Sequence, residues 1–153
     1  MKKYISQQEA LSLLQKYCAY QERCHREVRT KLLSLGIYGE YLEEIIGSLI
    51  EEDFLNEIRF AKTYARGKFR MKAWGRIKII QSLKQKGIND YCIKEAMKEI
   101  NPADYKETLH LILVQQLEKC PDLPSFERKS KAFRYALSRG FESPLIEEFF
   151  GRE

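Results

Sequence analysis

Residues 53–88 read DFLNEIRFAKTYARGKFRMKAWGRIKIIQSLKQKGI, and they combine a high positive charge with an apolar period typical of helices. From Arg59 to Ile88 it contains ten lysines and arginines and no aspartate or glutamate. Because the whole chain has a formal net charge of +5, the residues outside this segment carry a net charge of −5. Apolar residues recur among the cations at helical spacing, which indicates folded helices rather than a disordered basic tail. We therefore predict a basic helix pair that meets an acidic partner.

The same helical period runs through the rest of the chain, and no strand-like alternation of any length occurs. Ser6 and Glu9 form a capping box, which satisfies free backbone amides at a helix start. Glycine weakens helices, so we expect the helix that follows residue 56 to loosen at Gly67. Further helix starts are predicted at Asp53 or Asn56, Asn89 or Asp90, Asn101, Ser125 and Ser143. The pattern predicts an all-α protein of about nine helices.

Three glycines, Gly36, Gly87 and Gly140, are spaced 51 and 53 residues apart and indicate an internal repeat. A glycine ends a helix at least steric cost, because it lacks the Cβ atom that disfavours the left-handed conformation. Each glycine is followed at once by an apolar residue, and further apolar positions match across the three segments: Leu32, Leu83 and Ala136 before the glycines, Leu42, Ile93 and Ile146 after them. We predict three three-helix units, at residues 5–52, 53–100 and 101–151, that form an elongated, curved array.

Composition argues against several classes of function. The four cysteines form no CxxC pair and the chain has only two histidines, so we expect no metal site and no cofactor. No Walker loop, GxSxG motif or histidine-based triad occurs, and adjacent carboxylates such as Glu43 and Glu44 point apart on a helix; we predict no catalytic residue. No apolar run has membrane-spanning length and no leader follows Met1, so we expect a cytoplasmic protein. We also expect it to be a monomer.

The basic segment supplies the candidate contact residues. Aromatic side chains among cations can stack on unpaired bases, while cations meet phosphates or acidic loops. Two alternatives stay open: the cations form a solvated face, and Phe69 and Trp74 are core residues at helix ends. Arg59 suits a structural salt bridge equally well. The candidates are Arg59, Lys62, Arg66, Lys68, Arg70, Lys72, Trp74, Arg76 and Lys78.

The middle of the chain resembles the bacterial RecX family of RecA regulators. The resemblance rests on EEDFLNEIRFA at 51–61, Tyr64, Arg66, GRI at 75–77, Leu83 and KGI at 86–88. It extends to REVRTKLLSLGI at 26–37 and, more weakly, to LSRGF at 137–141. Asn56 stands where the family often has an acidic residue, and Trp74 where it usually has a smaller or polar one.

The resemblance implies a three-helix repeat protein that lies in the groove of the RecA–DNA filament. It would modulate, and most often inhibit, the recombinase and ATPase activities of RecA in recombination and DNA repair, with no catalysis of its own. The partners would be the RecA filament and the single-stranded or double-stranded DNA within it. The alternative is a free-standing helical DNA-binding protein that acts without RecA, but such proteins usually use one recognition helix and a dimer seam.

Overall fold

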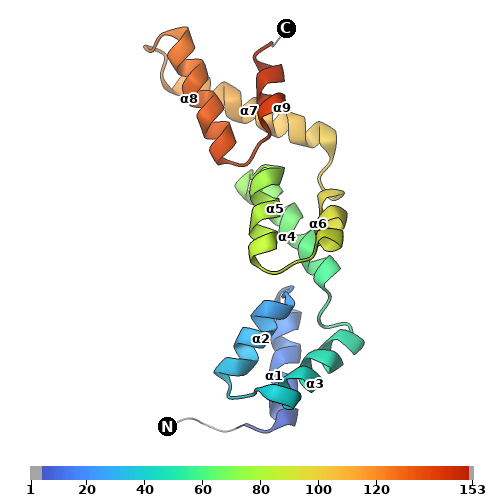
Figure 1. Cartoon of the computed structure of the whole chain (residues 1–153). Helices are drawn as coiled ribbons and strands as arrows, with labels where there is room; N and C mark the ends of the chain where they lie inside the picture. Colours follow the sequence, from blue (N-terminus) through green and yellow to red (C-terminus); the bar gives the residue numbers. More distant parts are fainter. Residues whose placement is uncertain (1–4, 152–153) are drawn as a thin grey trace.

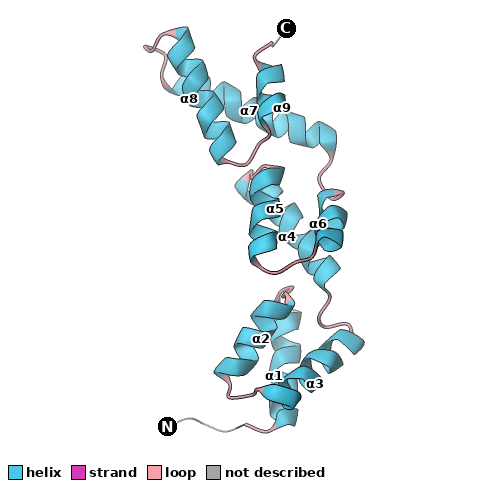
Figure 2. Cartoon of the chain, viewed as in Figure 1, coloured by secondary structure: helices cyan, strands magenta, loops and turns pink. Residues whose placement is uncertain are grey.

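The structure is a computed structural model that describes residues 5–151, and within that range it contains nine α-helices and no strand (Figure 2). The predicted all-α class is therefore confirmed. The helices are α1 (Gln7–Tyr20), α2 (His25–Ser34), α3 (Gly39–Glu51), α4 (Glu57–Lys72), α5 (Arg76–Gln85), α6 (Asp90–Met97), α7 (Pro102–Lys119), α8 (Ser125–Ser138) and α9 (Ser143–Phe149).

The helices pack in three consecutive groups of three, α1–α3, α4–α6 and α7–α9. The groups follow one another along an elongated molecule, with the first and last groups at opposite ends (Figure 1). The arrangement agrees with the tandem three-helix pattern expected from the sequence. The bounds of the three units as separate domains, at 5–52, 53–100 and 101–151, stay a prediction.

The three repeat glycines close the second helix of each group in the same way. Gly36, Gly87 and Gly140 have positive φ angles of 83°, 81° and 97°. In each case the amide of the next residue donates to a carbonyl five positions earlier, which is the Schellman arrangement. The bonds are Ile37 N to Leu32 O at 3.0 Å, Ile88 N to Leu83 O at 3.1 Å and Phe141 N to Ala136 O at 3.1 Å. All six of these bonded residues are buried. The three predicted repeats therefore end their second helices with the same backbone geometry.

Four helix starts follow the predicted caps, whereas α8 and α9 begin at the predicted residues Ser125 and Ser143 without a side-chain cap. The side chains of Ser6, Asn56 and Asn89 each accept a hydrogen bond from a first-turn amide. Asn101 caps α7 in the same way, ahead of a proline in the first turn. Ser125 does not cap α8: it is the first residue of that helix, and Pro124 occupies the N-cap position.

The expected weakening of the fourth helix at Gly67 is wrong. α4 runs without a break through Gly67 to Lys72, and it ends where Ala73 adopts the left-handed conformation with φ of 53°. Burial explains why the helix continues, because Phe60, Ala61, Ala65 and Phe69 all point into the core. Tertiary packing of this face outweighs the helix propensity of one glycine.

Residues 5–151 contain two hydrophobic cores. The first lies within α1–α3 and includes Leu55 from the following connection. The second is shared by α4–α9 and includes Cys24 from the first group, which is fully buried there. The middle and last groups therefore share one interior, whereas the first group has its own.

The middle and last groups are joined by backbone hydrogen bonds between two helix ends. The amides of Gly75 and Ile77, at the start of α5, donate to the carbonyls of Arg139 and Gly140, at the end of α8, at 2.7 and 3.0 Å. The free amides of one helix thus satisfy the free carbonyls of another, and the two helix dipoles align. A Cβ atom on Gly75 would lie 2.3 Å from the carbonyl carbon of Gly140, so the approach requires glycine.

Tyr105 of α7 fills the centre of this second junction. Its ring is fully buried between Phe69 and Phe141, with centroids 5.8 and 5.1 Å away. Its hydroxyl accepts a hydrogen bond from the Arg76 amide at 2.9 Å and donates one to Glu142. Burial, followed by the Glu142 contact, raises the pKa of the Tyr105 phenol. The phenol is therefore kept neutral, as a donor.

The first junction repeats this geometry with side chains in place of backbone. The start of α2 meets the end of α5, where Arg26 donates a hydrogen bond to the Gln85 carbonyl. The His25 amide donates to Glu57 at 3.0 Å. A Cβ atom on Gly87 would lie 2.8 Å from the Arg26 guanidinium. The second helices α2, α5 and α8 are thus stacked head to tail along the molecule.

Candidate nucleic-acid and filament interface

The nine candidate residues lie on α4, α5 and the short connection between them, but they do not form one uniform surface. Three of the arginines are ion-paired with carboxylates from outside the basic segment. The pairs are Arg59 with Glu22 at 2.6 Å, Arg66 with Glu99 at 3.2 Å and Arg76 with Glu142 at 2.8 Å. The lack of acidic residues within the segment therefore does not leave these three unpaired.

Arg59 makes the most polar contacts of these three arginines. Besides Glu22, it pairs with the Asp53 carboxylate at 3.1 Å and donates to the Asp53 carbonyl at 2.9 Å. The hydrogen bond with Glu22 is the main reason that the pKa of the Arg59 guanidinium is raised. These contacts tie the first group to the start of α4, as expected for the structural alternative. A role in partner contact stays a prediction.

Arg76 belongs to the junction between the middle and last groups. Its guanidinium carbon lies 3.9 Å from the centroid of the Tyr105 ring, while the charged group pairs with Glu142. The side chain is 29% exposed, which is low for an arginine available to a partner. The sequence could not reveal this use, since Glu142 lies 66 residues further along the chain.

The other five cations make no ion pair with any residue in the range 5–151. Arg70 and Lys72 are exposed at the end of α4. Lys62, together with Arg59 and Arg66, lines a shallow hollow beside α4. We call these five unpaired cations of α4, α5 and their connection the available basic surface: Lys62, Lys68, Arg70, Lys72 and Lys78.

The two aromatic candidates behave differently. Phe69 is 8% exposed and is a core residue. Trp74 is partly buried against the same core, and the ammonium groups of Lys68 and Lys78 lie 4.9 and 4.7 Å from its ring centroid. Cations at these distances are attracted to the ring face. Trp74 is thus both a packing residue and part of the basic surface.

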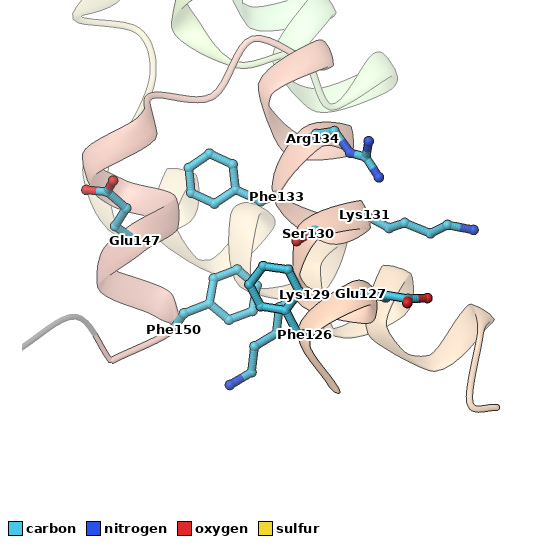
Figure 3. Close-up of a pocket in the computed structure, with 9 residues that line it drawn as sticks. All are labelled: Phe126, Glu127, Lys129, Ser130, Lys131, Phe133, Arg134, Glu147 and Phe150. Carbon is cyan, nitrogen blue, oxygen red and sulfur yellow. The ribbon is translucent and has the colours of Figure 1, made fainter. Parts of the chain in front are cut away.

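A separate hollow of about 910 Å³ lies between α8 and α9 (Figure 3). Phe126, Phe133 and Phe150 supply its apolar lining. Phe126 is 80% exposed, and Lys129, Lys131 and Arg134 of α8 also line the hollow. Sequence reasoning did not single out this region, although four cations within α8 (Arg128, Lys129, Lys131 and Arg134) were a usable signal.

The cysteines have the properties of packing residues. All four are free thiols, and Cys18, Cys24 and Cys92 are buried. Burial raises the pKa of Cys18 to about 11, and it also raises the pKa values of Cys24 and Cys92. A thiol shifted in this direction is a poor nucleophile, because the thiolate is the reactive form.

Across residues 5–151, no helix has the combination of length and apolar character that a membrane span requires.

Comparison with known proteins gives a consistent result. Residues 56–97, which contain all nine candidate residues, match the family model described as "RecX, second three-helix domain". A protein named "Regulatory protein RecX" from Pelodictyon phaeoclathratiforme is 30% identical over 116 residues, which cover 76% of this chain and 71% of that protein. The protein of the same name from Prosthecochloris aestuarii is 29% identical over 134 residues, covering 86% and 85%.

Some relatives are longer than this chain. The "Regulatory protein RecX" of Halalkalibacterium halodurans is 28% identical over 143 residues, but the chain spans only 54% of its length. Among solved structures, the "Crystal structure of RecX from Lactobacillus salivarius" has a TM-score of 0.86 at 25% identity and covers 94% of each chain. The "Crystal structure of regulatory protein RecX" has a TM-score of 0.85 at 24% identity, covering 94% and 72%, a likeness of fold.

Proposed function

This chain belongs to the RecX family of regulatory proteins, and we propose that it binds RecA–DNA filaments and restrains RecA. It would lie in the groove of the filament and lower the recombinase and ATPase activities of RecA, in recombination and DNA repair. It acts by binding and has no catalytic activity of its own.

The observation that supports this proposal most directly is the available basic surface on α4 and α5. It lies within the segment that matches the family model. Like charges close together on a helix cost free energy, about 0.2–0.5 kcal/mol for each pair, unless a partner compensates for them. DNA phosphates or acidic loops of a filament would supply that compensation. An elongated molecule also suits a groove, because it presents a long lateral surface.

The test is an ATPase and strand-exchange assay of the cognate RecA with and without this protein. We expect both activities to fall at ratios at or below one protein per RecA subunit. No change in either activity at stoichiometric protein would rule out RecA regulation. DNA binding together with unchanged RecA activities would instead support the alternative of a free-standing DNA-binding protein.

A charge-reversed variant tests the surface. Arg70→Glu combined with Lys72→Glu changes exposed residues and breaks none of the ion pairs described above. We expect weaker filament binding, a shallower salt dependence and an unchanged circular dichroism spectrum. The matched control is Lys94→Glu with Lys131→Glu, on α6 and α8, which changes the net charge equally and also breaks no ion pair of the described residues. Equal inhibition by both variants would exclude this surface as the contact.

A further inference from the structure

The first junction contains a second basic hollow, outside the candidate surface. It has a volume of about 410 Å³ and lies between α2 and the end of α5. Its lining includes the ring of Tyr17 and three cations, Arg26, Lys31 and Lys86. Within its described lining the one acidic residue is Glu27, whose carboxylate accepts the hydrogen bond of a backbone amide at the start of α2. The hollow therefore offers one aromatic ring and an excess of positive charge.

The ring of Tyr17 is held in place by Arg23. The guanidinium carbon of Arg23 lies 3.6 Å from the ring centroid, and its Nε atom donates to the Tyr17 carbonyl at 3.1 Å. The ammonium group of Lys31 lies 5.7 Å from the same centroid. A ring fixed in this way binds a flat ligand at a smaller entropic cost than a mobile one.

From this hollow a chain of cation–ring contacts leads into the candidate surface. The ammonium group of Lys86 lies 5.6 Å from the centroid of the Tyr64 ring, and the ammonium group of Lys68 lies 5.4 Å from the same centroid. Lys68 also contacts Trp74, at 4.9 Å. Three aromatic rings and the cations between them thus connect α1 with α5 across the junction. We call this set the aromatic seam: Tyr17, Arg26, Lys31, Lys86, Tyr64, Lys68 and Trp74.

We infer that the aromatic seam binds a single strand of nucleic acid, with a nucleotide in the hollow between α2 and α5. Alternating rings and cations fit such a strand, because unpaired bases stack on rings while phosphates meet cations. A double helix keeps its bases stacked inside and would leave the rings without partners. The inference rests on the DNA contact in the proposed function. It specifies that the bound DNA is single-stranded, and it extends the DNA contact to the first helical group, α1–α3.

Binding of a fluorescent oligo-deoxythymidine strand, followed by fluorescence anisotropy, tests the inference on the full chain. Lys31→Ala with Lys86→Ala removes two seam cations, both at the surface of the hollow. We expect the slope of log affinity against log salt to become shallower by about 1.4, since each lost phosphate contact on a single strand changes it by about 0.7. The control, Lys94→Ala with Lys131→Ala, removes two exposed lysines elsewhere that make no ion pair with a described residue. We expect it to keep the original slope.

Tyr17→Leu tests the stacking contact separately, because leucine keeps an apolar side chain beside the core. Affinity for the strand should fall about fivefold to about a hundredfold, as for the loss of one stacked base. A hairpin duplex of the same length should bind Tyr17→Leu and the unaltered protein equally. Circular dichroism serves as the folding control for every variant.

Three outcomes would overturn the inference: no binding of the strand by the unaltered protein, equal losses in the seam and control variants, or loss of filament binding with unchanged strand binding. The last outcome would assign the seam to a protein partner and leave the proposed function standing. Conversely, seam-dependent strand binding with unchanged RecA activities would support the seam and contradict the proposed function.

Discussion

At the scale of single residues, the three repeat glycines have the same role but different surroundings. A Cβ atom on Gly36 would meet nothing within 4 Å, whereas on Gly140 it would lie 2.4 Å from the Lys78 Cβ and 2.6 Å from the Lys78 amide nitrogen. Their left-handed conformation could be predicted from spacing. The crowding at Gly140 could not, because it depends on which helix end packs against it.

Alanine substitution separates these two effects. Gly36→Ala should lower the free energy of unfolding by about 1–2 kcal/mol, the usual cost of a left-handed alanine. Gly140→Ala should cost about 1–3 kcal/mol more, because the new methyl group overlaps Lys78. Urea denaturation measures both. If both substitutions lower the free energy of unfolding equally, the contact between α5 and α8 relaxes without cost.

Buried thiols should make the protein sensitive to alkaline pH. The pKa of Cys18 is raised by burial from 9.0 to about 11, so in the folded state the thiol stays protonated where an unfolded chain would ionise. The contribution of this thiol to the free energy of unfolding is fully present below pH 9 and is lost as the pH rises through about 11. We expect a loss on the order of 1–2 kcal/mol over this interval.

Urea denaturation under reducing conditions, repeated between pH 8 and pH 11, measures that loss. The raised pKa of Tyr105 acts in the same direction above pH 10, so Cys18→Ala should flatten the decline without abolishing it. An identical pH dependence in Cys18→Ala and the unaltered protein would contradict the assignment to this thiol.

At the scale of helices, the apolar period predicted which segments are helical, and the polar residues predicted most of their starts. The prediction failed at Gly67 because it weighed the propensity of one residue above a face of four buried side chains on α4. It also missed that Ala73, not a glycine, takes the left-handed conformation that ends this helix. Both outcomes depend on packing against α5 and α6, which the local sequence does not report.

Gly67→Ala should therefore stabilise the protein. The position is helical, and an added Cβ atom would meet nothing within 4 Å. The expected gain in the free energy of unfolding is about 0.5–1 kcal/mol, because alanine loses less backbone entropy than glycine in a helix interior. Gly47→Ala in α3 has the same surroundings and should give a similar gain. If Gly67→Ala lowers the melting temperature and Gly47→Ala does not, α4 needs local flexibility at position 67.

At the scale of the whole molecule, the two junctions differ in kind. The second has backbone hydrogen bonds and a core common to α4–α9, whereas the first depends on ion pairs and on one buried thiol, Cys24. The sequence predicted three similar units but not this difference. Arg59 pairs with Glu22 across 37 residues, and no local pattern identifies a partner at that distance.

We expect the first group to separate from the other two before the core of α4–α9 unfolds. Cys24 is buried at the junction, so its alkylation rate reports this opening, and Cys92 within the same core is the control. Raising the salt concentration should speed labelling of Cys24 up to about fivefold, because partly exposed ion pairs contribute about 0.2–1 kcal/mol. Arg59→Gln should speed it at low salt as well.

Peptide mass spectrometry distinguishes the cysteines in one experiment. Salt should leave the labelling rate of Cys92 nearly unchanged. Equal responses of Cys24 and Cys92 would mean that the three groups open as a single cooperative unit, contrary to the two-core arrangement.

The head-to-tail stack of α2, α5 and α8 also bears on how such a chain changes length. At each junction the start of one second helix meets the end of the next, so one outer end of the stack is a helix end and the other is a helix start. An in-frame duplication of one three-helix segment would bring matching ends together rather than create an unmatched surface. Gain or loss of a whole segment is thus the least disruptive genetic change open to this architecture.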